Sequence, residues 1–283
     1  MLRHTFCHIP GIGLLTEKLL WERGVHSWDE VGRKKLDFIS PQKQTILAQS
    51  LEESEEHLQQ RDAVFFAEVL PFDQQWRLFG EFRNQTAFLD IETTGLGAPR
   101  DQITTIVVYD GERIHSYVLG ENMDEFVPHI LEYKLIITFN GKAFDIPFIE
   151  RFLSAKIPIP HIDLRFELKR FGYRGGLKKC EQQLGVERTE VRDVDGYFAV
   201  LLWREYQRTG DPRVLETLLA YNTYDSVNLE TLMVLAYNMG LRDLPFEQRL
   251  KLELPEFPRI PFKAHREIIE AIQEDHGWQS EKE

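Results

Sequence analysis

The sequence predicts an α/β fold in which helices cover a mixed β-sheet, and the order of its apolar patterns is the reason. Three strand-like runs follow one another at residues 86–92, 102–110 and 113–119, separated by glycine and charged residues. A helical stretch and a further strand-like run follow at residues 124–133 and 134–140. Strands in succession, followed by alternating strands and helices, indicate a mixed sheet that buries its faces under helices.

A helical region precedes the sheet. Residues 1–39 have the pattern of short helices around the IPGIG segment. Ser40 and Pro41 suit the N-cap and the first position of a helix that continues to about residue 60. The apolar residues 62–70 could continue that helix.

Helices are also expected on the C-terminal side of the sheet. Their apolar periodicity covers residues 143–155, 176–185, 196–210 and 211–240. A proline-punctuated tail then ends in one more helix. From the changes of periodicity we expect three parts, namely an N-terminal helical region (1–80), a sheet-containing domain (81–240) and a C-terminal extension (241–283).

Composition excludes several classes of protein. No apolar run approaches the ~20 residues of a membrane span, and the N-terminus has no secretory apolar core, so we expect a cytoplasmic location without membrane contact. Two cysteines, Cys7 and Cys180, cannot form a disulfide framework, and Cys7 with His8 is too small a set for a zinc site. The net charge of −12 argues against a general nucleic-acid coat, because an acidic surface repels phosphodiesters. It is compatible with an enzyme whose acidic residues gather around metal ions.

The run AFLDIETTGLG places two carboxylates inside an otherwise apolar strand. Asp90 and Glu92 are two residues apart, so both side chains point to the same face of the strand. An unpaired buried carboxylate costs several kcal/mol, and hard oxygen ligands on one face suit Mg²⁺ or Mn²⁺. Alone, such a pair is also compatible with a solvated strand end.

Two further segments carry acids in suitable places. In ITFNGKAFDIPFI a strand ends at Asn140, Gly141 permits a sharp turn and Asp145 enters the next helix, although Asn140 and Asp145 are equally compatible with helix capping. In LLAYNTYDSVNLE, Tyr221 and Asp225 are four apart and share a helix face, a spacing that structural pairs also use.

Taken together, the three segments predict a metal centre. Two divalent ions ~3.5–4 Å apart need about four carboxylates, while substrate phosphate and water complete their coordination. One ion would activate the attacking water and the other would stabilise the leaving 3′ oxygen.

The motifs DIETTG, NGKAFD and YNTYD resemble those of the DEDD, or DnaQ-like, 3′–5′ exonucleases of the ribonuclease-H-like superfamily, over about residues 86–238. Within it the chain resembles the YprB-like branch, in HIDLRFELKR, in GGLKKCEQQLGV, in the DVDG turn at residues 193–196 and in YQRTGDPRVLETLLAYNTYD. The resemblance implies a central mixed five-stranded sheet flanked by helices. It also implies that the metal ligands are Asp90, Glu92, Asp145 and Asp225.

By the same resemblance, Tyr221 matches the tyrosine that orients the attacking water in the tyrosine-type subclass. Many relatives carry histidine there, which is a better proton acceptor near neutral pH. A tyrosine with a pKa of about 10 is a poor general base, so Tyr221 would only position the water. Tyr224 competes for this role, and the motif spacing favours Tyr221. Elsewhere, Asp163, two residues after His161, either supports the ligands from behind or is structural.

A basic segment between the second and third motifs is a candidate for substrate binding. Its six cations face one acid, Glu167, and glycines and aromatic residues interleave with them, as suits close approach to a phosphate backbone. The alternative is a solvated loop and helix face. The candidate substrate-binding residues are Thr93, Thr94, Asn140, Phe144, Arg174, Lys178 and Lys179. Phe144 could wedge the terminal base, whereas Phe148 is expected in the core.

The segment at residues 8–31 resembles a helix-hairpin-helix element. Gly11 and Gly13 would form a turn that presents backbone N–H groups to a phosphate, with Lys18 in the following helix. Similar segments also serve as packing or protein-binding units, and both interpretations stay open.

The sequence thus predicts a metal-dependent 3′–5′ exonuclease acting on single-stranded or frayed DNA or RNA ends, with two Mg²⁺ or Mn²⁺ ions. One alternative is a non-catalytic nucleic-acid-binding or adaptor protein, which four clustered acids disfavour because they repel phosphate. Another is a ribonuclease-H-like endonuclease, which the tyrosine before Asp225 disfavours. The acidic surface leaves room for a protein partner.

Overall fold

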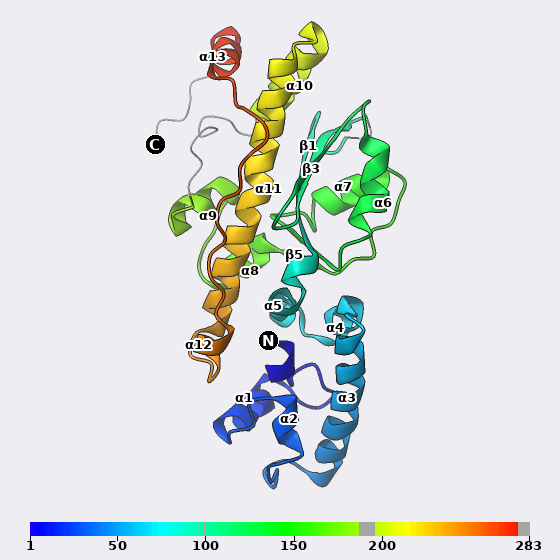
Figure 1. Ribbon diagram of the computed structural model, residues 1–283, viewed down its shortest axis with the longest axis vertical. Helices are drawn as coiled ribbons and strands as arrows, with labels where there is room; N and C mark the ends of the chain where they lie inside the picture. The colour runs from blue at the N-terminus through cyan, green and yellow to red at the C-terminus, as the bar shows by residue number, and fades with distance from the viewer. Residues whose placement is uncertain (99, 187–195, 277–283) are drawn as a thin grey trace.

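The computed structural model describes residues 1–98, 100–186 and 196–276, and its centre is a mixed five-stranded sheet (Figure 1). The strand order is β3-β2-β1-β4-β5. Strands β1, β2 and β3 are antiparallel neighbours, whereas β4 is parallel to β1 and β5 is parallel to β4. Their bounds are Thr86–Thr93 (β1), Ile103–Tyr109 (β2), Ile114–Val118 (β3), Leu135–Thr138 (β4) and His161–Asp163 (β5). The predicted fold class is confirmed.

Helices cover both faces of this sheet. Ala87, Leu89 and Ile91 of β1 pack on the side of α6 (Phe126–Ile130, preceded by the 3₁₀ turn η4, Met123–Glu125) and α7 (Asp145–Phe152). Helices α10 (Gly196–Thr209) and α11 (Pro212–Leu241) contact β1 from the opposite face (Figure 1). Two shorter helices, α8 (Leu164–Arg170) and α9 (Leu177–Leu184), lie beside α11.

Helix α11 is the longest element and crosses the sheet above β1 and β2. It begins as the sequence predicts, with Pro212 in its first turn and the Asp211 carboxylate accepting the Arg213 N–H at 2.9 Å. Most of its residues are buried, because the sheet covers one side and other helices and the C-terminal segment cover the rest. No helix in the described ranges is both long enough and apolar enough to cross a membrane.

The N-terminal region is helical, as expected, but its longest predicted helix is broken. Helix α3 starts at the Ser40 cap and ends at Gln59, and a separate α4 follows. Arg61 adopts a left-handed φ of 56°, and the Asp62 carboxylate caps α4 by accepting the Phe65 N–H at 3.1 Å. Its elements are η1 (Leu2–His4), α1 (Leu14–Glu22), α2 (Trp28–Val31), α3 (Pro41–Gln59), α4 (Ala63–Val69), η2 (Phe72–Leu78), α5 (Phe79–Phe82) and η3 (Arg83–Gln85).

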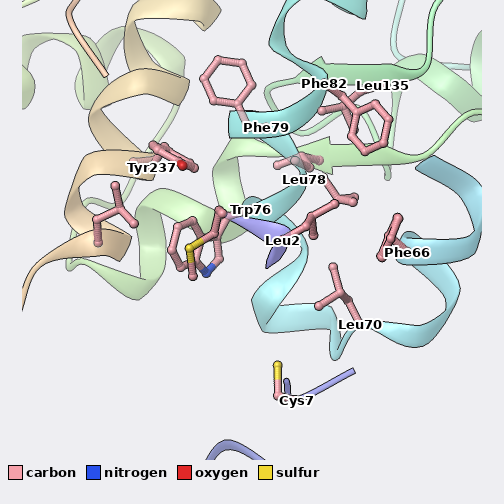
Figure 2. Packing of buried hydrophobic residues seen from close by; sticks show 14 of the residues in the cluster. Leu2, Cys7, Phe66, Leu70, Trp76, Leu78, Phe79, Phe82, Leu135 and Tyr237 are labelled. Carbon is pink, nitrogen blue, oxygen red and sulfur yellow. The ribbon is translucent and has the colours of Figure 1, made fainter. Parts of the chain in front are cut away.

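One apolar core joins this region to the sheet (Figure 2). Leu2 and Phe66 from the N-terminal helices belong to the same buried cluster as Leu135 of β4 and Tyr237 of α11. Residues on both sides of the expected boundary at residue 80 thus pack into the same apolar cluster. The boundary itself stays a prediction.

A buried ion pair ties the start of the chain to η2. The Arg77 guanidinium donates to both oxygens of Glu17 at 2.9 Å, and a Glu17 oxygen also accepts the backbone N–H groups of Phe6 and Cys7. Glu17 and Arg77 are 0% and 3% exposed. Because every interaction of this carboxylate is internal, its removal from water is tolerated only while the partners stay in place.

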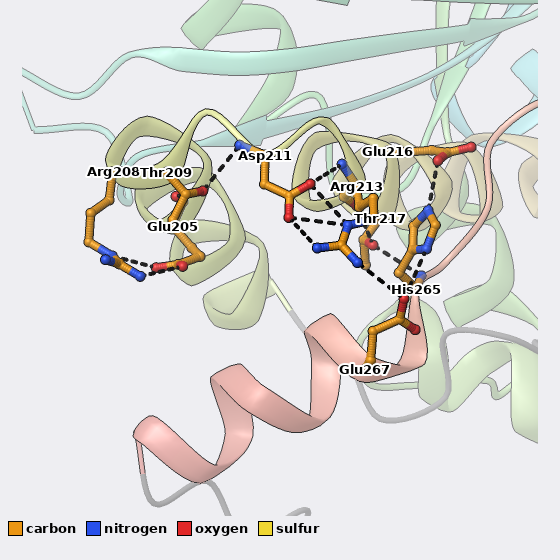
Figure 3. A network of polar contacts seen from close by, with 9 residues as sticks. All are labelled: Glu205, Arg208, Thr209, Asp211, Arg213, Glu216, Thr217, His265 and Glu267. Atoms are coloured by element: carbon orange, nitrogen blue, oxygen red, sulfur yellow. Dashed lines mark hydrogen bonds and ion pairs between the residues drawn. The ribbon is translucent and has the colours of Figure 1, made fainter.

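The C-terminal segment after α12 (Glu247–Leu250) runs along α11 to α13 (Arg266–Asp275) (Figure 1). At its far end the Glu216 carboxylate accepts from the His265 ring at 2.7 Å, and Thr217 accepts the His265 N–H at 3.1 Å (Figure 3). Nearer its middle, Phe257 stacks on Tyr224 of α11 with ring centres 5.5 Å apart. The segment is thus fixed to α11 at several points.

We expect Arg77→Met to lower the free energy of unfolding by about 3–5 kcal/mol, since it leaves Glu17 buried without its counter-charge. The measurement is urea unfolding followed by tryptophan fluorescence. Arg3→Met, which breaks the exposed Arg3–Glu55 pair, serves as the control and should cost less than about 1 kcal/mol. Equal losses in both variants would contradict the assigned weight of the buried pair.

Candidate functional site

Strand β1 carries the first two predicted ligands toward α11. Phe88 of β1 packs in the same apolar cluster as residues of α11. Because side chains alternate along a strand, Asp90 and Glu92 lie on that same face. A β-bulge between Glu92 and Thr93 interrupts the pairing with β2 directly after the second acid. The carboxylates therefore lie where the regular sheet ends and a loop begins.

Helix α11 supplies the third acid and an amide that sequence reasoning missed. Asn222 is fully buried, and its amide nitrogen donates to Asp90 Oδ2 at 2.6 Å. The Asn222 carbonyl oxygen in turn accepts from the Thr105 hydroxyl at 2.9 Å, which fixes the orientation of the amide. Its position inside the YNTYD motif was the available signal, but its partner is 132 residues away in the chain.

Three of the predicted ligands meet. Oxygen atoms of Asp90, Glu92 and Asp225 lie within 4.8 Å of one another. The pKa of Asp90 is raised well above its usual range, first by burial and then by the charges of Asp225, Glu92 and Asp145, while the Asn222 hydrogen bond opposes the shift. A hard divalent cation fits this donor set, because carboxylate oxygens are the ligands it prefers and its charge offsets their repulsion.

Asp145 lies in the same cleft but outside that cluster of three. It is the first residue of α7 and is 4% exposed. Burial raises its pKa to about 7; its own N–H opposes this shift, and the charge of Asp163 adds to it. A carboxyl group with such a pKa releases its proton to solvent readily when a cation binds beside it.

The turn that leads to Asp145 differs from expectation in one detail. The left-handed residue is Asn140, with a φ of 68°, and not Gly141. Gly141 is needed for another reason, since a Cβ there would lie 2.2 Å from Thr138 Oγ1. The Asp163 carboxylate holds the turn by accepting the N–H groups of Asn140 at 2.7 Å and Lys142 at 3.1 Å. Asp163 is thus structural, and it adds charge behind Asp145.

A cleft of about 550 Å³ contains the site. All five predicted catalytic residues line it, and so do four of the predicted substrate-binding residues. These nine are Asp90, Glu92, Thr93, Thr94, Asn140, Phe144, Asp145, Tyr221 and Asp225. The Thr93 hydroxyl donates to the Gly95 carbonyl at 2.6 Å and the Thr94 hydroxyl accepts the Gln102 N–H at 2.9 Å, so both threonines shape the wall of the cleft.

The two tyrosines of the third motif have different positions. Tyr221 is 4% exposed and lines the cleft, and the Lys178 ammonium lies 5.4 Å from its ring centre. Tyr224 is not among the cleft residues and packs against Phe257. Of the two tyrosines, Tyr221 is therefore the one that lies in the cleft with the carboxylates. Phe148 is buried in the core and packs edge-on against Phe144, as expected.

Helix α10 contributes a wall of the cleft that the sequence analysis did not assign. Tyr197, Val200 and Arg204 follow a spacing of three and four residues, which places them on one helix face. Arg204 is exposed and brings a cation to the acidic cleft. The helical spacing was visible in the sequence, but nothing local showed that this face turns toward β1.

The other predicted binding residues lie outside the acidic cleft. Arg174 lines a neighbouring cleft. Lys178 and Lys179 are on α9, whose first turn also lines that neighbouring cleft. Gly11, with a φ of 77°, and Gly13 are exposed in the N-terminal region, where only the three-residue η1 precedes the turn. Of the DVDG segment, residues 193–195 lie outside the described residues.

Comparisons with known proteins agree with this picture. Residues 87–237 match the model of the RNase H superfamily. The chain is 27% identical over 218 residues to the uncharacterized protein YprB of Bacillus subtilis (strain 168), which covers 69% of this chain and 52% of YprB. The chain thus spans about half the length of the curated relative it matches.

Two of the solved structures that align with the chain are each 18% identical to it. The family B DNA polymerase from Pyrobaculum calidifontis aligns over 59% of this chain and 27% of its own, with a TM-score of 0.42. Brucella melitensis NrnC aligns over 60% of this chain and 82% of its own, with a TM-score of 0.40. Scores this low carry no argument about activity. The family match spans more than half of the chain and all four carboxylates, and so this protein belongs to the RNase H superfamily.

Proposed function

We propose that this chain is a 3′–5′ exonuclease of the DEDD type, with a tyrosine in its third motif. It would hydrolyse phosphodiester bonds at the 3′ ends of single-stranded or frayed DNA or RNA, in the cytoplasm. The observation that carries the proposal is the meeting of Asp90, Glu92 and Asp225 within 4.8 Å inside a cleft that Asp145 also lines. Such a set of carboxylates destabilises the fold when no cation is bound, and it can position catalytic metal ions when they are bound.

The donor set suits Mg²⁺ or Mn²⁺, and we propose two ions. When bound, divalent cations would activate the attacking water and stabilise charge on the leaving 3′ oxygen. Asp90, Glu92 and Asp225 would hold them from one side of the cleft, and Asp145 would complete the set. The products would be a nucleoside 5′-monophosphate and a strand shortened by one nucleotide with a free 3′ hydroxyl.

The remaining residues of the cleft would orient the substrate. Tyr221 would place the attacking water through its hydroxyl group, since a phenol with a pKa of about 10 is a weak base at neutral pH. Phe144 lines the cleft beside Asp145 and is half-buried, so its ring is available to the terminal base. Thr93, Thr94 and Asn140 would define the space that this nucleotide occupies.

Binding beyond the cleft is part of the same proposal. Arg174, Lys178 and Lys179 would contact backbone phosphates through charge, independently of base sequence. The turn at Gly11 and Gly13 remains a proposed phosphate contact, and the helix-hairpin-helix interpretation rests on its exposure and the left-handed φ of Gly11.

Asp90→Ala should lower the rate of 3′ shortening by more than about 100-fold, because it removes a ligand from the centre of the cluster. The measurement uses 5′-labelled single strands of DNA and RNA with Mn²⁺, resolved by length. Asp124→Ala, an exposed acid outside the cleft, is the matched control and should behave as the native chain. Metal-insensitive binding without any cleavage would instead indicate a binding protein, and cleavage of a circular single strand would indicate an endonuclease.

Asn222→Ala should lower the rate by about 10–100-fold, since Asn222 orients Asp90 and touches no reacting atom. Its hydrogen bond also lowers the pKa of Asp90, so its loss should raise that pKa and move the acid limb of the pH–rate profile to higher pH. A pH series on both proteins checks this. A lower rate with an unmoved profile would mean that Asn222 only supports the fold.

In EDTA, the contribution of the Asp145 carboxyl group to the stability of the native protein should fall as the pH rises from about 4 through 7. Asp145 keeps its proton in the folded state up to about pH 7, whereas the unfolded chain releases it near 4, so this carboxyl group is more protonated in the folded state over this window. Asp145→Asn should therefore be more stable than the native chain by about 2 kcal/mol at pH 8, with a smaller gap at pH 5. Urea unfolding at both values measures the gap, with the exposed Glu52→Gln as control. Parallel curves at all pH values would contradict the assigned protonation.

A further inference from the structure

We propose that a second, basic cleft next to the acidic one binds the single-stranded segment on the 5′ side of the terminal nucleotide. This inference rests on the proposed function for its polarity, because the 3′ end would lie in the acidic cleft. The basic cleft has a volume of about 530 Å³ and is lined by residues of α8 and of the start of α9. Both helices lie beside α11 (Figure 1).

The two clefts are adjacent. Phe139 and Asn140, at the end of β4, line both of them. The Arg165 guanidinium, which lines the basic cleft, donates to the Asn140 side-chain oxygen at this border. A strand that leaves the acidic cleft over Asn140 therefore enters the basic cleft directly.

The charge of the second cleft is opposite to that of the first. Its lining residues include the cations Arg165, Lys169 and Arg174 and no carboxylate, although the whole chain carries a net charge of −12. Lys169 and Arg174 are exposed, and neither forms an ion pair within the described ranges. Exposed cations that are grouped in one cleft of an acidic protein favour binding of a polyanion over a structural role.

The backbone of the cleft favours the same ligand. Gly175 and Gly176 line it, and Gly176 caps α9 without any side chain over the helix start. A Cβ at Gly176 would meet no atom within 4 Å, so there is open space beside the backbone of this N-cap residue. The first N–H groups of α9 and the three cations can therefore approach one phosphate backbone together.

Aromatic rings stand at both borders of the basic cleft. Phe139 separates it from the acidic cleft, and Tyr173 separates it from a third cleft of about 710 Å³. Both rings are partly buried against the apolar core and also line the cleft, so the part of each ring that stays accessible can contact a base. Stacking of this kind tolerates any base, as an enzyme that acts on unrelated 3′ ends requires.

The third cleft limits the length of the site. It is lined by two cations, Arg242 and Lys251, and by two acids, Glu247 and Glu253. Such a balanced lining gives no net attraction for phosphates. The structure thus assigns a bound segment that starts at the acidic cleft, fills the basic cleft and ends near Tyr173.

The test compares Lys169→Ala/Arg174→Ala with Lys35→Ala/Arg266→Ala, a pair that removes the same two charges from exposed positions outside all three clefts. The dissociation constants of 5′-fluorescein oligo(dT) of about two, four and eight nucleotides are measured in EDTA, where hydrolysis stops, across about 50–200 mM salt. Hydrolysis of the same strands is then measured in Mn²⁺.

We expect the cleft pair to weaken binding of the longest strand at least tenfold and to reduce the slope of log Kd against log salt by about 1–1.5, because two phosphate contacts are lost. The control pair should change binding less than about twofold. In Mn²⁺ the cleft pair should slow hydrolysis of the eight-nucleotide strand by a larger factor than hydrolysis of the dinucleotide. Equal effects of the two pairs would overturn the inference. Failure of the proposed function would show separately, as no shortening in Mn²⁺ by the native chain.

Discussion

The repulsion among carboxylates where β1 meets α11 is the constraint on which the rest of the structure depends. Asp90, Glu92 and Asp225 converge from a strand and a helix that are far apart in the chain, and Asp145 adds a fourth charge. The Asn222 amide donates to Asp90 of this group from the helix side. Burial and neighbouring charges raise the pKa values of Asp90 and Asp145, so a proton or a bound cation stabilises this group.

The turn after β4 couples this acidic centre to the basic cleft beside it. Asp163 fixes the backbone of the turn, and Asn140 then stands between the two clefts with its side chain bonded to Arg165. The strained φ of Asn140 is tolerated because both its backbone and its side chain are held by hydrogen bonds. One short segment thereby positions Asp145 on one side and organises cations on the other.

Much of this arrangement could be predicted from the sequence, because strand alternation and helix spacing are local properties. The spacing of Asp90 and Glu92 showed a shared face, and that of Tyr221 and Asp225 showed another. Local patterns could not show which amide would reach Asp90, since Asn222 and Asp90 meet only when α11 packs on the sheet. They also could not show that α10 turns Arg204 toward the acids. The break between α3 and α4 depends on the left-handed conformation of Arg61. Arginine has no preference for this conformation, so the sequence could not predict the break.

The N-terminal region and the C-terminal segment both act on the position of α11. The first packs against the C-terminal part of the helix through Trp76, Phe79 and Tyr237, and the second contacts it at Tyr224 and Glu216. Rotation of α11 by a single residue would turn Asp225 about 100° away from β1, since a helix has 3.6 residues per turn. Catalytic groups tolerate displacements of only about 0.5 Å. The N-terminal region and the C-terminal segment therefore have a structural role even without a ligand of their own. They hold α11 in the position relative to β1 that brings the carboxylates together.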